Sequence, residues 1–272
     1  MTDLKDQIAT NFSAAASAYD QYAVMQQQAA LALTRRLSEI HPQVPEGPLL
    51  EVGCGTGALS RGVVTLFPGR RLTLIDLAPG MIAKNRQSLR PLLPSPALVD
   101  WKVQDAETIT VRHHYALIAS CLTLQWFQDL PGTLARLAEA LLPGGLLLCS
   151  FPGDDSFPEW RRICQTLALP CTINPLPNGR EVLEMVHSRG YEASLHQETL
   201  TIPYPTVRGF LRSFKKTGTC TALPRPIPAG IGLHGAARLT PSQMARLLAA
   251  WQGEAPGPVT VTYRINTLLV RS

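Results

Sequence analysis

A glycine-rich turn is the most informative segment of this 272-residue chain. Gly53, Gly55 and Gly57 follow the apolar segment 48–52 and precede segment 58–67, whose apolar residues have helical spacing. Glycines allow the backbone to turn sharply and to approach a ligand without a Cβ clash. A turn between a predicted strand and a predicted helix therefore indicates a ligand-binding loop, and its spacing also fits a dinucleotide fingerprint.

Three carboxylates distinguish between the ligands that such a loop binds. Glu51 stands immediately before the turn, Asp76 ends the second predicted strand, and Asp105 follows the third. Nearby carboxylates repel a pyrophosphate, whereas they attract a ligand that carries an ammonium and a sulfonium. The acids therefore favour S-adenosylmethionine, whose ribose diol also suits Asp76, over a dinucleotide. A glycine turn with purely structural carboxylates is the alternative.

The other reactive side chains form no recognisable catalytic or metal-binding pattern. None of the six cysteines belongs to a CxxC pair, and the six histidines have no ligand spacing beside them. We therefore expect no structural zinc site, no disulfide framework and no metal cofactor. There is no signature of a Ser/His/Asp triad, and the adjacent His113 and His114 are expected to be exposed to solvent.

Strands and helices are predicted to alternate in the region that carries these acids. Strands are expected at 48–52, 71–76, 97–104, 115–120 and 146–151, and helices at 58–67, 80–89 and 133–142. This alternation is typical of a parallel sheet with helices on both faces. The predicted fold class is therefore α/β, with a Rossmann-like sheet.

The regions on either side are predicted to be a lid and an insertion. Residues 4–39 have helical spacing and no strand partner, which indicates a helical lid. A helix is expected at 181–189, and segments 193–202 and 259–270 are expected to close the sheet as an antiparallel pair. Two helices are expected between those strands, in a stretch broken by prolines at positions 224, 226 and 228.

The start of the second of these helices has a clear capping signature. Thr240 is suited to the N-cap, Pro241 to the first helical position and Gln243 to the third. We expect the whole chain, 1–272, to form a single domain. Its predicted parts are a helical lid at 1–45, a cofactor-binding core at 46–152 and a C-terminal part at 153–272 with a helical insertion at about 205–252.

Positive charge is concentrated in the last part of the chain. Residues 1–150 hold 12 basic and 12 acidic residues, whereas residues 151–272 hold 13 basic and 8 acidic residues. No acidic residue occurs between Glu198 and Glu254, an interval with seven cations: Arg208, Arg212, Lys215, Lys216, Arg225, Arg238 and Arg246. Such a surface attracts an acidic partner, and an ordinary solvated face is the alternative. Aromatic residues are sparse there, which weakens a nucleic-acid interpretation.

Membrane insertion and secretion are not indicated by the sequence. No apolar run reaches the roughly 18 residues that a membrane-spanning helix needs. The segment 1–22 is polar and rich in alanine, without the apolar core of a signal peptide. We therefore expect a cytoplasmic location.

The glycine turn and its acids resemble the class I S-adenosylmethionine-dependent methyltransferases over about residues 46–152. That resemblance implies that Gly53, Gly55 and Gly57 pack under the methionine part of the cofactor, after Glu51. It further implies a ribose contact by Asp76 and an adenine site with these lining residues: Leu77, Met81, Asp105 and Ala106.

A narrower resemblance covers segments 12–20, 120–126 and 210–219. These segments are similar to those of the malonyl-[acyl-carrier protein] O-methyltransferases of biotin synthesis. Many members have Asn at the position of Cys121 and Ala at that of Thr219, and neither departure removes a charged residue or a glycine. The related trans-aconitate methyltransferases share the first two segments more than the third.

This resemblance implies methylation of the free carboxylate of a malonyl thioester on acyl-carrier protein or coenzyme A. A carboxylate is ionised at neutral pH, so alignment and exclusion of water suffice and no general base is needed. Tyr19 is the leading catalytic candidate, by a hydroxyl contact with the carboxylate or by closing the lid; packing beside Phe12 and Tyr22 is the alternative. Leu122 and Gln125 are expected to contact the cofactor or substrate, and Trp126 to lie in the core.

The segment 207–217 is predicted to be the carrier-binding helix. Val207, Phe210, Leu211 and Phe214 form one stripe at helical spacing, and Gly218 is suited to end the helix. The substrate-binding candidates are on the other faces: Arg208, Arg212, Lys215 and Lys216. A small-molecule carboxylate methyltransferase of the trans-aconitate kind and a non-catalytic nucleic-acid-binding module are the alternative functions.

Overall fold

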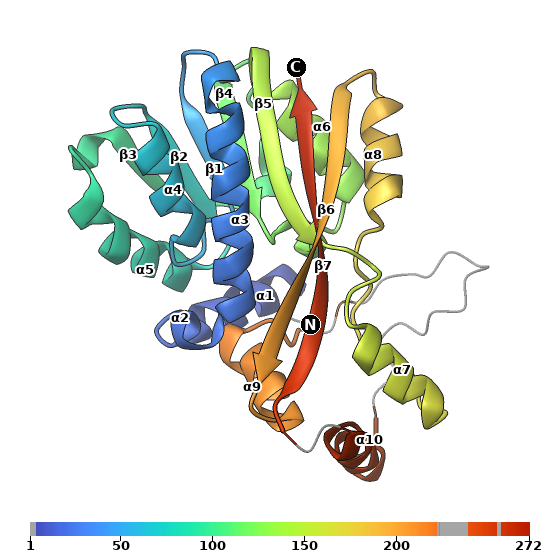
Figure 1. Cartoon of the computed structure of the whole chain (residues 1–272). Coiled ribbons are helices and arrows are strands. Elements are labelled where there is room, and N and C mark those ends of the chain that lie inside the picture. Colours follow the sequence, from blue (N-terminus) through green and yellow to red (C-terminus); the bar gives the residue numbers. More distant parts are fainter. Residues whose placement is uncertain (1–3, 222, 224–238, 255–256) are drawn as a thin grey trace.

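The computed structural model describes residues 4–221, 223, 239–254 and 257–272 (Figure 1). The strands are β1 (Leu49–Val52), β2 (Leu72–Asp76), β3 (Val99–Val103), β4 (Tyr115–Cys121), β5 (Leu141–Pro152), β6 (Glu192–Tyr204) and β7 (Val259–Arg271). They form one seven-stranded sheet in the order β3-β2-β1-β4-β5-β7-β6. β1 to β5 are parallel, and β7 is antiparallel to β5 and β6. The predicted α/β sheet with an antiparallel closing pair is confirmed.

Ten α-helices surround this sheet in the described part of the chain. They are α1 (Leu4–Ala15), α2 (Tyr19–Tyr22), α3 (Val24–Ile40), α4 (Ala58–Leu66), α5 (Pro79–Leu89), α6 (Leu130–Glu139), α7 (Pro158–Thr166), α8 (Gly179–His187), α9 (Val207–Thr217) and α10 (Pro241–Glu254). Short 3₁₀ turns lie at His41–Gln43, Arg90–Leu92, Pro96–Leu98, Ala106–Thr108 and Leu124–Trp126.

Side-chain alternation along the strands builds a hydrophobic core on each face of the sheet. In β1, Leu49 packs into the cluster formed with α3, α4 and α5, whereas Leu50 packs into the cluster formed with α6 and α8. All four residues of β1 are buried, as expected for a central parallel strand that is covered on both faces. The carboxyl ends of the parallel strands, where the three acids were predicted, therefore meet at one edge of the sheet.

The predicted helical stretch 4–39 is divided into three helices with different roles. α1 and α2 lie across the carboxyl ends of the strands, while α3 packs along the sheet (Figure 1). Leu33 and Leu37 of α3 are 1% and 0% exposed. Moving α3 away would expose both, at a cost of about 1.5–3 kcal/mol each. α3 therefore packs as part of the core, and we propose that α1 and α2 form the lid.

The helix predicted at 133–142 was wrong at both ends. α6 begins earlier because Asp129 is its N-cap and accepts a hydrogen bond from Gly132 N at 2.9 Å. It ends earlier because the fully buried Leu141 pairs with Tyr115 in the sheet. The segment Pro143–Gly145 is a bulge within β5 and does not end the helix.

The C-terminal helices form a third hydrophobic cluster beside the extended ends of β6 and β7. α7, α9 and α10 pack there (Figure 1), and α7 was absent from the sequence-based prediction. The predicted start of α10 is confirmed, since Thr240 N donates to Gln243 Oε1 and Gln243 N donates to Thr240 Oγ1. Pro224, Pro226, Pro228, Arg225 and Arg238 lie outside the described residues. Among those described, no helix combines the length and hydropathy needed to cross a membrane.

Candidate functional site

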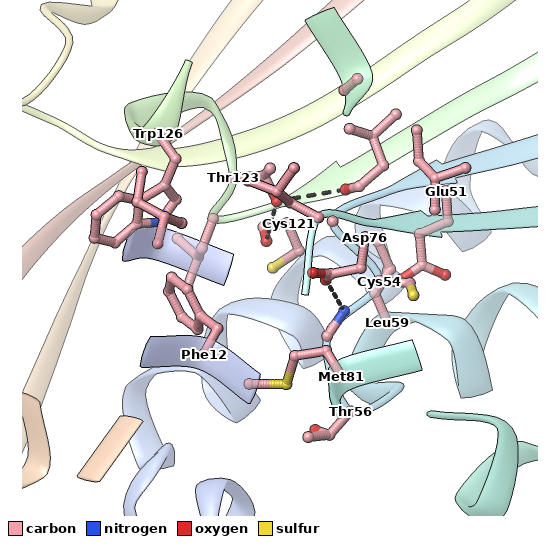
Figure 2. Close-up of a pocket in the computed structure, with 18 of the residues that line it drawn as sticks. Phe12, Glu51, Cys54, Thr56, Leu59, Asp76, Met81, Cys121, Thr123 and Trp126 are labelled. Atoms are coloured by element: carbon pink, nitrogen blue, oxygen red, sulfur yellow. Dashed lines mark hydrogen bonds between the residues drawn. The ribbon is translucent and has the colours of Figure 1, made fainter. Parts of the chain in front are cut away.

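The glycine-rich turn between β1 and α4 adopts a backbone conformation that favours glycine. Gly53 and Gly55 have φ values of 68° and 50°. A Cβ on Gly53 would lie 2.1 Å from Thr123 Oγ1, so the turn and the segment after β4 are in close contact. A Cβ on Gly55 would meet no described atom within 4 Å. The turn therefore borders open space, a pocket that we call the polar pocket (Figure 2).

The carboxylate of Asp76 is held beside this turn by backbone amides. Its Oδ2 accepts from Gly55 N and its Oδ1 from Ala78 N, each at 2.9 Å. Burial raises the pKa of Asp76, and the amide hydrogen bonds oppose that rise. Each carboxylate oxygen has a second lone pair, so Asp76 retains acceptor capacity for the two hydroxyls of a ribose.

Glu51 is a buried acid at the end of β1 that faces the polar pocket. It is 1% exposed, and its Oε2 has no hydrogen-bond partner among the described residues. Burial raises the pKa of Glu51 to about 8; the Ser60 hydroxyl opposes this rise and the nearby Asp76 adds to it. Ionising a buried acid is costly unless a cation contacts it. This environment therefore suits an ammonium group on the ligand.

The lid carries two polar contacts to the edge of the polar pocket. Lys5 Nζ of α1 lies 2.5 Å from Asp105 Oδ2 and 3.1 Å from Glu107 Oε2. Burial lowers the pKa of Lys5, but the hydrogen bonds to both acids outweigh it and raise the pKa. Thr56 Oγ1 of the glycine turn donates to Asp20 Oδ1 of α2 at 2.6 Å. Both contacts join the predicted lid to the edge of the polar pocket, and the first involves the acid predicted to read the adenine.

Aromatic side chains form the side of the polar pocket away from the buried acids. Phe12 of α1 meets Trp126, which follows β4, in an edge-to-face contact with ring centroids 5.3 Å apart. Figure 2 shows these two rings on one side of the pocket and Glu51 on the other. Trp126 was expected in the core, but it is half-buried and faces the pocket because the turn after β4 directs it toward the lid.

Tyr19 of α2 completes the aromatic side, with its ring 6.5 Å from that of Phe12. Within the described residues, no protein group hydrogen-bonds its hydroxyl. Burial raises the pKa of Tyr19 above its ordinary value, and nearby Cys121, Asp76 and Asp20 act in the same direction. The phenol is therefore neutral at physiological pH and able to donate a hydrogen bond to a ligand.

A larger cavity of about 620 Å³, which we call the apolar cavity, adjoins the polar pocket. The two share five lining residues: Phe12, Tyr19, Gln26, Leu122 and Trp126. The walls of the apolar cavity come from α7, α9, the segment 172–176 and the ends of β6 and β7. No described residue of its lining carries a charge.

The structure brings most of the predicted site residues together. Ten of them line the polar pocket: Tyr19, Glu51, Gly53, Gly55, Asp76, Leu77, Met81, Asp105, Ala106 and Leu122. Gln125 lines the apolar cavity instead. Gly57 lies behind the turn as the N-cap of α4, where a Cβ would face Ser88 and Asn85.

The four predicted carrier-binding cations line neither space in this structure. Arg208, Arg212, Lys215 and Lys216 are all exposed on the outer side of α9. The opposite side behaves as predicted, since Val207 and Phe210 are buried. Gly218 ends the helix with a φ of 75°, as its position suggested.

Several pocket residues were not identified from the sequence. Lys5 contacts Asp105 across 100 positions, so no local spacing could indicate the pair. Thr56 and Thr123 lie within motifs that had been recognised, but only the fold shows that they face the pocket. Three or more His, Cys, Asp or Glu side chains in a metal-binding group are not found among the described residues.

Comparison with known proteins gives the family of the chain. A family model described as "Methyltransferase domain" matches residues 50–147. Phosphoethanolamine N-methyltransferase 2 of Haemonchus contortus, solved with S-adenosyl-L-methionine, has the same fold with a TM-score of 0.59 and 16% identity, over 100% of this chain and 60% of that chain. The biotin biosynthesis bifunctional protein BioCD of Bordetella avium is 37% identical over 62% of this chain and 35% of its own length.

A full-length likeness is found to the malonyl-[acyl-carrier protein] O-methyltransferase of Magnetococcus marinus. The two are 31% identical over 261 residues, which cover 95% of this chain and 89% of that protein. This match extends well beyond residues 50–147, the part that the family model covers. The chain therefore belongs to the malonyl-[acyl-carrier protein] O-methyltransferase family.

Proposed function

We propose that this protein transfers a methyl group from S-adenosylmethionine to the free carboxylate of a malonyl thioester on acyl-carrier protein. The names of its relatives support this reaction and its place in biotin synthesis. The structural observation that carries the proposal is the junction of two different spaces at Tyr19. One space contains the carboxylates of Glu51 and Asp76, and the other has no charged residue in its described lining and is large enough for an acyl substrate.

The polar pocket fits S-adenosylmethionine in the chemistry of its side chains. Glu51 lacks a hydrogen-bond partner for Oε2 and suits the ammonium, while Asp76 suits the ribose hydroxyls. Leu77 and Met81 supply apolar surface for the adenine beside Asp105 and Ala106. When bound, S-adenosylmethionine supplies an electrophilic methyl group.

The chain's own contribution to the reaction is to orient the carboxylate and to exclude water. The neutral Tyr19 hydroxyl donates a hydrogen bond to one oxygen of the substrate carboxylate at the junction. The other carboxylate oxygen remains free to attack the methyl group. The aromatic rings of Phe12 and Trp126 shield the junction from solvent. A carboxylate and a sulfonium become a neutral ester and a neutral thioether, so charge is lost during the transfer. Apolar surroundings therefore favour the transition state.

The lack of charged side chains in the described lining of the apolar cavity argues against a small polycarboxylate as the substrate. A tricarboxylate such as trans-aconitate would retain further negative charges after the first methyl transfer. Burying such a charge without a cation is costly, and the described lining of the apolar cavity has none. A malonyl thioester has a single carboxylate, which the reaction neutralises.

The outer side of α9 is the proposed docking surface for the acidic carrier. Arg208, Arg212, Lys215 and Lys216 are exposed there on the helix whose inner side lines the apolar cavity. The proposal includes no metal, no nucleic acid and no membrane partner. It places the protein in the cytoplasm, a reducing compartment that suits its six free cysteines.

A methyl-transfer assay with four acceptors tests the proposal. Malonyl-carrier protein is expected to be methylated most efficiently, followed by malonyl-coenzyme A, with no turnover of trans-aconitate or free malonate. Product is identified by mass as the methyl ester. Efficient methylation of trans-aconitate would instead assign the protein to small-molecule chemistry. Salt-dependent RNA binding without methylation of any acceptor would contradict the enzymatic function.

A further inference from the structure

The apolar cavity is larger than its proposed acyl group requires. Cavities of roughly 300–1,000 Å³ enclose drug-sized ligands, and this one measures about 620 Å³. A malonyl group has only three carbons, and its carboxylate must reach the junction at Tyr19. Most of the apolar cavity therefore lies beyond the acyl group, along the path by which the rest of the substrate enters.

The inner side of α9 gives this remaining space a distinctive chemistry. Ser213 Oγ donates to Phe210 O at 2.6 Å, and Thr217 Oγ1 donates to Ser213 O at 2.8 Å. Thr219 Oγ1 lies 3.0 Å from Thr217 Oγ1. Each hydroxyl that donates to a carbonyl retains lone pairs that can accept a hydrogen bond. Phe210, Leu211 and Phe214 separate these acceptors with apolar surface.

A neutral chain of methylene and amide groups matches this lining. Its N–H groups would meet hydroxyl acceptors, and its methylenes would meet aromatic and aliphatic side chains. The absence of charge among the described lining residues disfavours a charged ligand there. The phosphopantetheine arm of a carrier thioester has this composition between the thioester and its phosphate.

Two parts of the lining of the apolar cavity agree with the position of such an arm. Tyr19 and Trp126 line both the apolar cavity and the polar pocket, so the two spaces adjoin there. At another point the lining includes Cys220, which is exposed and follows the C-terminus of α9. Lys215 and Lys216 lie in the last turn of the same helix and are also exposed. They would meet the phosphate or the acidic carrier where the arm leaves the cavity.

We propose that the apolar cavity is a binding site for the pantetheine arm, with its entrance beside Cys220 at the end of α9. The proposal rests on the proposed function, since the arm belongs to the malonyl thioester. It makes α9 a two-sided element. The inner side recognises the uncharged arm through Ser213 and Thr217, and the outer side recognises the carrier through its cations.

Kinetics with two malonyl thioesters that lack both phosphate and carrier protein separate arm recognition from carrier docking. Malonyl-pantetheine has the full arm without phosphate or protein, whereas malonyl-N-acetylcysteamine has only its first amide. We expect the ratio of kcat/KM for malonyl-pantetheine to kcat/KM for malonyl-N-acetylcysteamine to be at least ten. Thr217→Val, which keeps the side-chain shape, is expected to reduce this ratio severalfold, whereas Arg189→Glu, in the exposed turn after α8 and outside both linings, is expected to leave it unchanged. Equal kcat/KM values for the two thioesters would overturn the proposal.

Protection of Cys220 from alkylation provides a measurement that does not depend on turnover. Malonyl-pantetheine is expected to slow the labelling of Cys220 by a maleimide at least fivefold, and equal concentrations of malonate are expected to have no effect. Cys220→Ser identifies the labelled site and should remove the fast phase. If malonyl-pantetheine does not change the rate of Cys220 labelling, the proposed entrance beside Cys220 is wrong. Methylation of carrier-bound malonate without arm preference would refute this inference alone, whereas no methylation of any thioester would refute the proposed function.

Discussion

The buried Glu51 and the half-buried Asp76 of the polar pocket are held in different ways. Asp76 receives backbone amides on both oxygens, so its charge is supported before a ligand arrives. Glu51 has no hydrogen-bond partner for Oε2 among the described residues, and its pKa is raised to about 8. Glu51 is therefore largely protonated at pH 7 in the free protein, and cation binding must displace that proton.

Proton release on cofactor binding tests this role of Glu51. Calorimetry at pH 7 in buffers of different ionisation enthalpy is expected to show release approaching about one proton per S-adenosylmethionine bound. Glu51→Gln cannot ionise, so proton release should be lost and affinity reduced.

The stability of the free protein should also depend on pH through Glu51. At a pH between the unfolded pKa of Glu51, near 4.5, and its folded pKa of about 8, this acid takes up a proton when the protein folds. Its contribution to stability is therefore lost as pH rises through that window.

Thermal unfolding measures this second effect without ligand. The Tm advantage of Glu51→Gln over the native protein is expected to grow from pH 6 to pH 8 and then to level off. A Tm difference that does not change with pH, together with unchanged proton release, would mean that Glu51 is ionised in the free protein. The cation-binding role would then lose its physical basis.

Tyr19 is expected to act by donating a hydrogen bond and not by acting as a base. Tyr19→Phe keeps the ring beside Phe12 but removes the donor, so kcat should fall about 10- to 100-fold, as for a lost hydrogen bond to a charged group. Because burial raises the pKa of Tyr19, the native kcat should be flat between pH 7 and pH 9. Tyr22→Phe, in the same helix but outside both linings, is the matched control. Wild-type kinetics in Tyr19→Phe would leave Tyr19 as a packing residue of the lid.

At the scale of elements, the lid depends on close backbone contacts with its neighbours. A Cβ on Gly80 of α5 would lie 2.7 Å from both Cα and O of Ser13 in α1. A Cβ on Gly218 at the end of α9 would lie 2.8 Å from Asn11 O. The lid is therefore held between the cofactor-binding side and the predicted carrier-binding helix. With the lid in this position the polar pocket encloses about 140 Å³, below the roughly 300 Å³ of typical ligand pockets, so we expect the lid to open when a ligand enters.

Gly80→Ala is expected to displace the lid without altering the acids of the polar pocket. Overpacking of this kind costs about 1–3 kcal/mol, which corresponds to at least about fivefold faster release of S-adenosylmethionine. Hydrogen exchange of α1 should increase as well. Gly253→Ala in α10, where a Cβ meets no described atom within 4 Å, is the matched control. Unchanged release and exchange in Gly80→Ala would show that this contact does not hold the lid.

Substitutions on the outer side of α9 are expected to change the kinetics of the carrier substrate and not the binding of S-adenosylmethionine. Charge reversal at Arg212, Lys215 or Lys216 should raise KM for malonyl-carrier protein severalfold and leave affinity for S-adenosylmethionine unchanged. Interactions between exposed charges are screened over about 8 Å at physiological ionic strength, so added salt should weaken the native protein more than the variants. Arg189→Glu makes the same charge change on an exposed turn after α8. If all three reversals match this control, the cations are only a solvated face.

At the scale of the whole molecule, the sheet connects the three largest hydrophobic clusters of the described residues. β7 contributes Leu268 to one cluster and Tyr263 to the cluster of α7, α9 and α10. We therefore propose that lid, core and C-terminal part form one domain, and we expect a single calorimetric unfolding transition. Saturating S-adenosylmethionine should raise its Tm by mass action. Two separate transitions, with only one shifted by the ligand, would contradict the single domain.

Local patterns of the sequence were sufficient for the sheet, the glycine turn and the surface of α9. Strand alternation, glycine spacing and helical periodicity depend on neighbours within a few residues, so they can be read without the fold. The capping box of Thr240 and Gln243 and the end of α9 at Gly218 are of this kind. The strand and turn patterns also indicated that Glu51, Asp76 and Asp105 lie at the ends of successive strands and therefore close together.

Only the tertiary structure showed the other walls of the polar pocket and the apolar cavity beside it. The contact of Lys5 with Asp105, the position of Trp126 at the junction and the apolar cavity depend on segments that are far apart in the chain. The end of α6 likewise depended on pairing between Leu141 and β4 and not on helix propensity. The sequence by itself thus determined the cofactor chemistry, because the acids follow their strands. The space for the substrate was decided by packing, because its walls come from elements whose spacing in the sequence carries no common signal.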